Sequence, residues 1–440
     1  MSDALSLESS MLTSGPTWQR RVEWALLAVG LLVYIVMRHT IDGDAGVRYN
    51  TLVHLLASGQ ISSARYPIIQ ELVTIPLYVV GALAHEPAAY VAHFNLIVFA
   101  GGLVVLTGLL RPSVDPDVLR RFALLVVAGS MFPYHSQNYY GEIFTSVLIA
   151  IGLALYASDR TRAAVGTTVL GLINTPIAVG AFTFVAIRGI WRSKRWIAWL
   201  APVVVALALI VVEAIIRRGG VVRTGYEGDA GFRTVLPYSG RTGFSYPLLL
   251  GVISELFSFG KGILWFAPGL LLVAARRRRL TASAEAFLVM ALVFLGGLVL
   301  VYAKWWSWYG GWYWGPRFLL FAAFPASLLL ALHLTSTTED RRGVRILTVA
   351  VLWLAVWVGA SGAVFGQDGQ AICQQNNYQL EYLCWYVPEF SPLVLPFIGH
   401  RLLQLTDWLI LAYFAAVGLC LTIPVFTAWR GETRASRLSR

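Results

Sequence analysis

Long apolar stretches alternate with short polar segments along almost the whole chain of 440 residues. A helix needs about 20 mainly apolar residues to cross the hydrocarbon core of a bilayer. Most of the apolar stretches approach this length, so the pattern predicts an all-α, polytopic membrane protein with about 12 transmembrane helices, within a range of 11–13. The expected spans lie near 22–38, 89–110, 119–134, 143–157, 164–174, 177–190, 196–216, 258–275, 282–303, 317–334, 346–366 and 405–428.

Two stretches depart from this simple alternation. Asn174-Thr175-Pro176 interrupts the run over 164–190, which indicates either a tight outer turn or a kink within one helix. Residues 68–83 are apolar but short, and they contain Glu71 close to their start. We expect them to form a helix on the membrane surface inside a long first outer loop.

Composition supports a membrane protein and excludes other classes. Hydrophobic residues make up 57% of the chain and charged residues 13%, against roughly 45–50% and about 25% in soluble domains. This balance excludes a soluble enzyme, a disordered chain and a coiled coil. The net charge of +11 comes from short basic clusters between apolar runs, which is typical of topology signals. No nucleic-acid motif is found, and no nucleic-acid partner is expected.

The basic clusters predict the orientation. With a cytoplasmic N-terminus, the inner segments contain 22 of the 34 lysine and arginine residues, as the positive-inside rule requires. We therefore expect a multi-pass protein of the plasma (inner) membrane with both termini cytoplasmic. Residues 1–19 form a polar tail, 20–428 a single transmembrane domain, and 429–440 a basic tail.

The outer loops are the long ones, and they are expected at 39–88, 217–257, 304–316 and 367–404. Because loops held by a rigid scaffold commonly carry function, the active site is expected on the extracytoplasmic face. Cys373 and Cys384 share the last outer loop, where an oxidising compartment favours a disulfide. Two unpaired thiols are the alternative.

Acidic residues in two outer segments are candidates for chemistry. Asp42 and Asp44 follow the first span, and a carboxylate so close to the bilayer needs water or a partner. They form a solvated turn, or they act as a general base or metal ligands. Glu142 starts a span after a polar turn that contains His135. Here a favourable helix-dipole contact competes with an acceptor or metal role.

An aromatic segment is the most specific pattern in the chain. Seven of the fourteen residues from Lys304 to Arg317 are aromatic. An interfacial belt is one explanation, but the density of rings and the terminal Arg317 favour binding of a sugar, a lipid and a phosphate. Lys261, between two glycines, is a second phosphate candidate or a lysine that reaches lipid headgroups. The sugar and lipid candidates are Trp306, Trp308, Tyr309, Trp312 and Trp314.

Together, these motifs resemble the GT-C superfamily of integral-membrane glycosyltransferases, in particular the protein O-mannosyltransferase and aminoarabinose-transferase type. The match extends over roughly 20–335, and its acidic motif departs from the Asp-Glu pair that is common in the family. The motifs are Asp42 with Asp44, Tyr66-Pro67, Glu142, Gly260 to Gly262, and Gly310 to Arg317.

The resemblance implies a hexosyl- or pentosyltransferase that uses a polyprenyl-phosphate-linked sugar. It implies an inverting reaction at an acceptor hydroxyl on a protein, lipid or polysaccharide, with Asp42 as the preferred base and Asp44 as the alternative. Asp44 and Glu142 would orient the acceptor or share a divalent cation such as Mg²⁺ or Mn²⁺; the acids are equally compatible with a site that has no metal. The donor phosphate would be bound by Arg317, Lys261, Arg48 and Arg65.

Two other functions fit the same pattern. A transporter or flippase of a lipid-linked sugar would also have an even number of spans, but it predicts repeat symmetry and ionisable residues in mid-membrane. Neither is clear in the sequence. A catalytically inactive scaffold with the same fold is the other alternative, because the Asp-Gly-Asp variant departs from the family motif.

Overall fold

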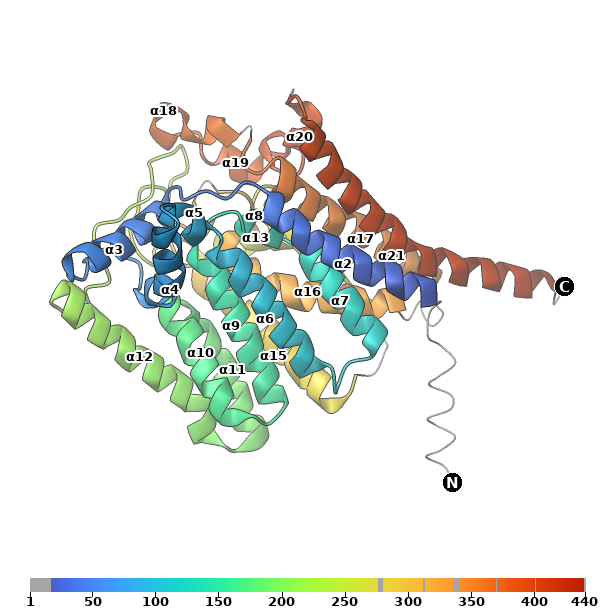
Figure 1. Cartoon of the computed structure of the whole chain (residues 1–440), viewed down its shortest axis with the longest axis horizontal. Coiled ribbons are helices and arrows are strands. Elements are labelled where there is room, and N and C mark those ends of the chain that lie inside the picture. Colours follow the sequence, from blue (N-terminus) through green and yellow to red (C-terminus); the bar gives the residue numbers. More distant parts are fainter. Residues whose placement is uncertain are drawn as a thin grey trace.

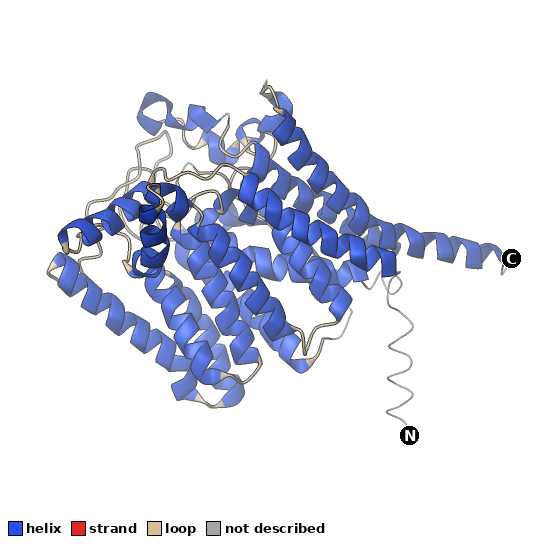
Figure 2. Cartoon of the chain, in the orientation of Figure 1, coloured by secondary structure: helices blue, strands red, loops and turns tan. Residues whose placement is uncertain are grey.

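The computed structural model describes residues 17–275, 280–311, 313–335, 341–368, 370–399 and 401–438, with side chains described as far as residue 427. Within these ranges the chain is helical, and it forms no strand beyond two isolated bridges (Figures 1 and 2). The predicted all-α class is therefore confirmed. Trp312, the first 16 residues and the basic cluster at 276–279 lie outside the described residues.

The elements follow one another with short connections, except for the long segment between α12 and α13. The first half contains α2 (Thr17–Val36), α3 (Asp44–Ser58), α4 (Ile69–Leu83), α5 (Pro87–Ala92), α6 (Phe94–Leu110), α7 (Pro116–Ala128), α8 (Phe132–His135), α9 (Gly141–Ala157), α10 (Thr161–Asn174), α11 (Ala178–Ser193) and α12 (Trp196–Arg218). The second half contains α13 (Leu248–Phe257), α14 (Ile263–Phe266), the 3-10 helix η2 (Pro268–Ala275), α15 (Ala282–Tyr302), the 3-10 helix η3 (Arg317–Ala322), α16 (Ala323–Thr335), α17 (Arg342–Val364), η4 (Gln370–Gln374), α18 (Gln375–Tyr378), α19 (Leu383–Tyr386), η5 (Pro388–Phe390), α20 (Leu395–Ile398) and α21 (Leu405–Leu438).

Several of these helices have the length and composition of membrane spans. This supports a multi-pass membrane protein, whereas the number of twelve spans stays a prediction. Shorter apolar helices occupy Ile69–Leu83, Gly141–Ala157 and Leu248–Phe257. The six segments of the described chain that meet both criteria are Pro87–Leu110, Trp196–Arg218, Ala282–Tyr302, Arg317–Thr335, Arg342–Val364 and Leu405–Thr427.

The structure corrects the continuity of some expected spans. Residues 258–275 do not form one α-helix: four-residue α14 is followed by the 3-10 helix η2, which begins at Pro268. A proline ring removes one backbone donor and clashes with the preceding turn, so an α-helix cannot run through unchanged. By contrast, the run over 164–190 is two helices, α10 and α11, joined by a turn, which agrees with the two separate spans expected there and not with the alternative of a single kinked helix.

The core of the bundle is built around α7 and α16. Every residue of α16 from Ala323 to Leu334 is buried, as expected of a helix that is apolar all round. Helix α17 approaches α7 closely at Gly359, where an added Cβ would lie 2.1 Å from the carbonyl oxygen of Ala128. This contact requires a glycine, because any side chain would push the two helices apart.

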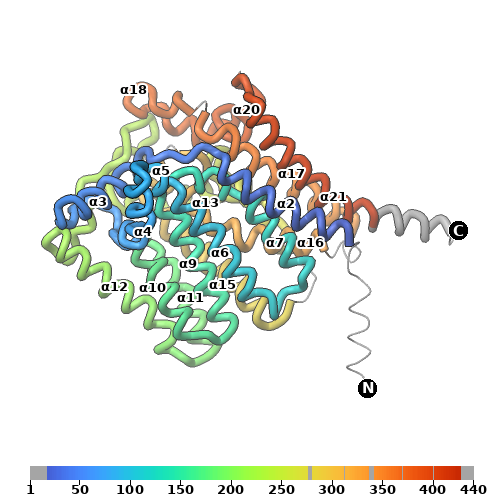
Figure 3. The backbone as a smooth tube through the Cα atoms, in the orientation of Figure 1, coloured from blue at the N-terminus to red at the C-terminus, as the bar shows by residue number. Residues whose placement is uncertain are grey.

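The candidate site lies where the first outer loop, the α8–α9 turn and the aromatic segment meet, which we call the site end. Helices α3, α5, α8 and α13 and the short helices α18 and α20 gather there (Figures 1 and 3). Thr40 donates its backbone N–H to the carbonyl of Gln137 at 2.8 Å, which joins the first loop to the α8–α9 turn. A disulfide between Cys373 and Cys384 closes the last loop of this end.

A buried ionic cluster joins three helices at the opposite end of the bundle. Glu23 of α2 is fully buried and pairs with both Arg120 and Arg121 of α7. Arg121 also donates to the carbonyl of Leu334 at the end of α16, at 2.8 Å. Among the described residues, Glu23 is the acidic partner of Arg121, whereas Arg120 also pairs with Asp117 at 3.0 Å.

We predict that Glu23→Ala destabilises the fold strongly, because it leaves buried Arg121 without an acidic partner among the described residues and Arg120 with Asp117 alone. Removal of one partner from a buried pair typically costs about 3–5 kcal/mol. Thermal unfolding in a fixed detergent measures the loss. Arg20→Gln is the control, since Arg20 is 36% exposed in its pair with Asp117, and an equal drop in both variants would contradict the prediction.

Candidate active site

A buried arginine forms the centre of the site. Arg317 is the first residue of η3 and is only 7% exposed. Its Nη2 donates to Oδ2 of Asp44 at 2.7 Å, and its Nε lies 3.6 Å from Oε1 of Glu142. The structure therefore brings together three residues that the sequence analysis had selected separately, from three distant segments of the chain.

Aromatic rings enclose the guanidinium. Its central carbon lies 4.2 Å from the ring centre of Tyr313, 5.1 Å from that of Phe318 and 5.7 Å from that of Tyr140. Tyr140 and Tyr313 also contact each other edge to face, with 5.1 Å between ring centres. Stacking on ring faces stabilises a desolvated cation, so the rings hold Arg317 in place while its edge faces the carboxylates.

Glycines make this approach sterically possible. Gly43, the residue before α3, has a φ of 55°, and a Cβ on it would lie 2.3 Å from the hydroxyl oxygen of Tyr313. Glycine is the residue that adopts positive φ without steric cost. As a result, the backbone N–H of Asp44 reaches the Tyr313 hydroxyl at 3.3 Å, and the Asp44 side chain faces Arg317.

The environment of Asp44 favours its charged form. Burial alone would raise the pKa of the Asp44 carboxyl, but the charge of Arg317, hydrogen bonds from Tyr66 and Arg317, and the charge of Arg65 outweigh it and lower the pKa. Asp44 is therefore an ionised partner of Arg317 at neutral pH.

Asp42 has a different environment from Asp44. Its side chain is exposed, and its backbone carbonyl accepts a hydrogen bond from Ala45 N–H at 3.1 Å. Among the described residues, no ion pair includes the Asp42 carboxylate. The two aspartates of the Asp-Gly-Asp motif thus divide into one that is held by Arg317 and one that is open to solvent.

The two predicted phosphate-binding arginines of the first loop already have acidic partners. Arg48 is buried and pairs with Glu71 at 3.3 Å, with its guanidinium 4.8 Å from the ring centre of Tyr66. Arg65 pairs with Asp229 and lies 5.4 Å from the same ring. Both cations flank Tyr66, which itself hydrogen-bonds Asp44, so their charges contribute to the potential at the site without direct contact with Arg317.

Lys261 is bound to the backbone of the aromatic segment, where its role is structural. Its Nζ donates to the carbonyls of Gly311 at 2.8 Å, of Gly315 at 3.1 Å and of Tyr313. A lysine ammonium has three protons, and three carbonyl oxygens take them. Its predicted contact with a phosphate would require these bonds to break, whereas its present contacts hold the turn that places Tyr313 and Arg317.

His135 is fully buried, and neither ring nitrogen has a hydrogen-bond partner among the described residues. Burial first, and the charges of Arg317 and Lys261 next, lower the pKa of His135 to about 3. The imidazole is therefore neutral at physiological pH. Within the described chain, no group of three or more His, Cys, Asp or Glu side chains is arranged to hold a metal ion.

The predicted sugar-binding rings occupy different environments. Trp314 is fully buried against Tyr134 and Phe266, with ring centres 5.2 and 5.1 Å away. Trp308 and Tyr309 are buried in a second cluster with Trp385, whereas Trp306 is half-buried. Buried rings cannot stack on a ligand without rearrangement, so Trp306 is the described member of this set with a partly accessible face.

Arg217, at the end of α12, is not among the residues predicted from the sequence. It donates to the carbonyls of Ser62, Ala64 and Tyr66 at 2.7, 2.8 and 2.7 Å and also pairs with Glu213. Arg217 thus fixes the segment that carries Arg65 and Tyr66. The only signal in the sequence is an arginine at the end of an apolar run, which the positive-inside rule does not explain on the outer side.

Comparison with known proteins gives a match in structure alone. No protein-family model and no curated protein matches the chain by sequence. A crystal structure of ArnT from Cupriavidus metallidurans bound to undecaprenyl phosphate matches with a TM-score of 0.50 and 15% identity, over 93% of this chain and 77% of that chain. The apo structure of the same protein matches with a TM-score of 0.48 and 15% identity, over 91% and 75%. The chain shares the fold of this ArnT, which confirms the predicted resemblance at the level of the fold.

Glu381 links the aromatic segment to the disulfide-closed loop. It is 3% exposed and accepts a hydrogen bond from the Tyr309 hydroxyl at 3.0 Å. Burial raises the pKa of Glu381 to about 8, although the bond from Tyr309 and the charge of Lys261 oppose the shift. In an unfolded chain the pKa of a glutamate is about 4.3, so the folded protein binds more protons between these two values.

We predict that the contact between this loop and the aromatic segment weakens as the pH rises through about 8. The stabilisation is complete below the unfolded pKa and is lost above the folded pKa, where a buried carboxylate must ionise. Amide hydrogen exchange of residues 370–390 at pH 6 and pH 9, expressed as protection factors that correct for the intrinsic exchange rate at each pH, measures the change.

Glu381→Gln should remove this pH dependence, because an amide still accepts the bond from Tyr309 and does not ionise. Glu389→Gln is the control, since Glu389 is exposed in the same loop. Equal protection factors at both pH values in the wild-type protein would show that Glu381 does not govern the contact.

Proposed function

We propose that the protein is a glycosyltransferase that moves a sugar from a polyprenyl-phosphate donor to an acceptor hydroxyl. The observation that carries the proposal is the buried Arg317, which meets Asp44 and Glu142 in a fold shared with ArnT. One of the matching ArnT structures contains undecaprenyl phosphate. A buried, pre-oriented guanidinium beside carboxylates suits a reaction in which a phosphate leaves and an acceptor loses a proton.

The proposed reaction is a single displacement at the anomeric carbon of the sugar. The acceptor oxygen forms a bond to this carbon as its proton passes to the carboxylate of Asp42. The bond from the anomeric carbon to the phosphate oxygen breaks at the same time, and its electron pair leaves with the lipid phosphate. Inversion at the anomeric carbon follows from attack on the face opposite the leaving group.

Asp42 is the better candidate for the base because its carboxylate is exposed and carries no ion pair within the described residues. Asp44 is held by Arg317, which lowers the pKa of Asp44 and makes it a weaker proton acceptor. We therefore assign Asp44, together with Glu142, to the orientation of Arg317. This assignment leaves proton transfer and phosphate stabilisation on two different side chains.

Arg317 would stabilise the charge that develops on the leaving phosphate. Arg48 and Arg65 would strengthen the positive potential on the side of Tyr66. Mg²⁺ is often held by one or two carboxylates together with substrate phosphates, so Asp44 and Glu142 fit such an ion when a donor is bound. The ion would supply further neutralisation of the phosphate charge.

We predict that Asp42→Asn lowers the rate of transfer by about 10²–10⁴-fold, the usual contribution of a general base. The protein should fold normally, because the Asp42 side chain is exposed. The assay uses protein in lipid nanodiscs with a panel of radiolabelled polyprenyl-phosphate sugars, with and without EDTA, and follows release of the lipid phosphate.

Asp159→Asn, an exposed aspartate far along the chain from the site, is the matched control and should keep wild-type turnover. Wild-type turnover by Asp42→Asn would overturn the assignment of the base. Absence of release with every donor would overturn the proposed activity itself and favour transport of a lipid-linked sugar, which a flipping assay then examines.

We predict that Arg317→Gln reduces transfer by about 10²–10³-fold, as expected when one group that stabilises developing charge is lost. This variant also leaves Asp44 and Glu142 without their cation, so a loss of stability would lower the measured transfer rate as well. The double variant Arg317→Gln with Asp44→Asn keeps the original net charge of the pair. It should recover stability in thermal unfolding but not activity; recovery of both would exclude Arg317 from the phosphate site.

A further inference from the structure

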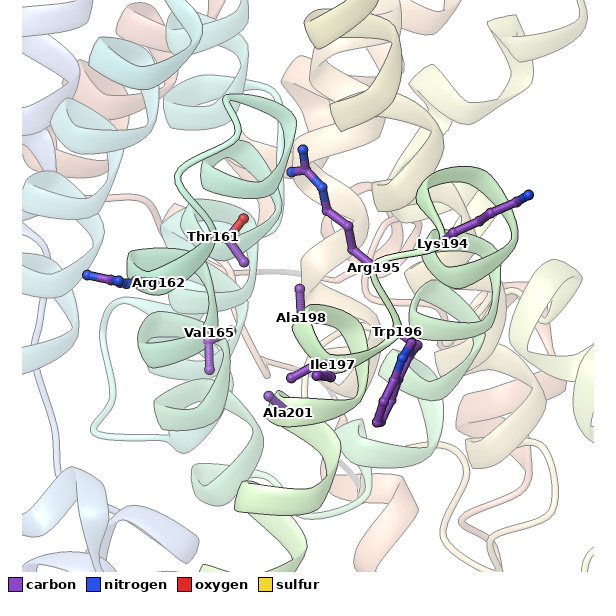
Figure 4. A pocket seen from close by; sticks show the side chains of 9 residues that line it. All are labelled: Thr161, Arg162, Val165, Lys194, Arg195, Trp196, Ile197, Ala198 and Ala201. Atoms are coloured by element: carbon purple, nitrogen blue, oxygen red, sulfur yellow. The ribbon is translucent and has the colours of Figure 1, made fainter.

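A second site lies at the end of the bundle opposite Arg317. An open pocket of about 630 Å³ forms between the start of α10 and the turn from α11 into α12 (Figure 4). Helix α9 runs from the site end to the pocket. The first turn of α9 carries Glu142 beside Arg317, and the turn after its last residue leads into α10. Nothing in the proposed transfer reaction uses this pocket.

The walls of the pocket are apolar and open towards the lipid-facing side of the bundle. Helix α12 is the least buried of the six candidate spans, with only 17% of its apolar window covered by the rest of the protein. Ile197, on this helix, is 64% exposed. An acyl chain would therefore reach the pocket directly from the bilayer. The apolar wall residues are Val165, Ile197, Ala198 and Ala201.

The rim of the pocket is basic. Arg162, Lys194 and Arg195 line it, and Figure 4 shows Arg195 extended between the helices, with Arg162 and Lys194 on either side and their charged ends pointing outward. Arg195 pairs with Asp159 at 3.4 Å, but the two side chains are 66% and 89% exposed. Such an exposed pair contributes little. Among the described residues, no ion pair involves Arg162 or Lys194, so these cations are available to an anion.

We propose that this pocket binds one anionic phospholipid, with the phosphate at the basic rim and an acyl chain along the apolar wall. Basic pockets between transmembrane helices recognise phosphate-containing headgroups in this way. The sequence predicts that this end faces the cytoplasm, where anionic lipids attract basic residues. Topology alone accounts for the basic residues but not for an apolar pocket between them.

Two backbone features strengthen anion binding at the same rim. Helices α10 and α12 both begin at the pocket, at Thr161 and Trp196, and neither N-terminus has a side-chain cap. Their first N–H groups are thus available to a phosphate oxygen. A lipid bound there would join α10 to α12, the helix whose far end holds the first loop through Arg217.

The test compares lipid retention by the full-length protein in nanodiscs that contain phosphatidylglycerol and phosphatidylcholine. Native mass spectrometry after release should show one retained phosphatidylglycerol on the wild-type protein. The triple variant Arg162→Gln, Lys194→Gln, Arg195→Gln should bind it roughly tenfold more weakly or worse, since each basic residue near a membrane adds to anionic-lipid attraction.

The control variant Arg111→Gln, Arg188→Gln, Arg192→Gln removes the same charge from the same end without touching the pocket, and it should retain the lipid. An equal loss in both variants would reduce the effect to general charge attraction and overturn the site. Wild-type retention by the pocket variant would overturn it as well.

Two further experiments test the apolar wall and the headgroup contact separately. Ala201→Phe fills the apolar wall without a change of charge and should also reduce retention, which covers the case in which the triple variant folds poorly. Glycerol 3-phosphate, which has the headgroup phosphate but no acyl chain, should not compete with phosphatidylglycerol. Efficient competition would show a site for soluble phosphates and overturn the assignment to a lipid.

Discussion

A guanidinium buried at the site end is the constraint on which the rest of the site depends. A buried charge is tolerated only when it is paired and hydrogen-bonded, and Arg317 meets this condition through Asp44 and Glu142. These two acids begin α3 and α9, so the pairing requires the first loop, the α8–α9 turn and the aromatic segment to converge. Because buried Arg317 needs both acidic partners, the three segments must lie side by side.

The convergence rests on backbone details more than on the charges themselves. Gly43 lets Tyr313 approach the start of α3, because any other residue would collide with its hydroxyl. Lys261 holds the carbonyls on both sides of Tyr313 and so determines the shape of the turn before Arg317. Arg217 performs the same task for the loop that leads to Tyr66. Buried cations that bind carbonyl oxygens therefore support the segments that place Arg317, the cation to which we assign the proposed phosphate contact.

The two ends of the molecule use their charges differently. At the site end, arginines are buried and paired, which suits preorganised stabilisation of a reacting phosphate. At the opposite end, Glu23 and Asp117 pair with buried arginines inside the bundle, whereas Arg162 and Lys194 stay exposed around an apolar pocket. Helix α12 connects these regions along one lipid-facing side, since it starts at the pocket and ends at Arg217.

The amino-acid sequence was enough to predict the structural class of the protein, and it pointed to three residues, Asp44, Glu142 and Arg317, that meet in the candidate site. Apolar runs of membrane-spanning length predict the helical class, since a bilayer leaves few other structures for a chain of this composition. The order of the motifs between the expected spans predicts that Asp44, Glu142 and Arg317 lie on the same face of the membrane. Tertiary structure decided which residues meet: it separated Asp44 from Asp42, engaged Lys261 with three carbonyls, buried Trp308 and Trp314, and broke the run over 258–275. These outcomes depend on contacts between segments far apart in the chain, and local periodicity contains no information about such contacts.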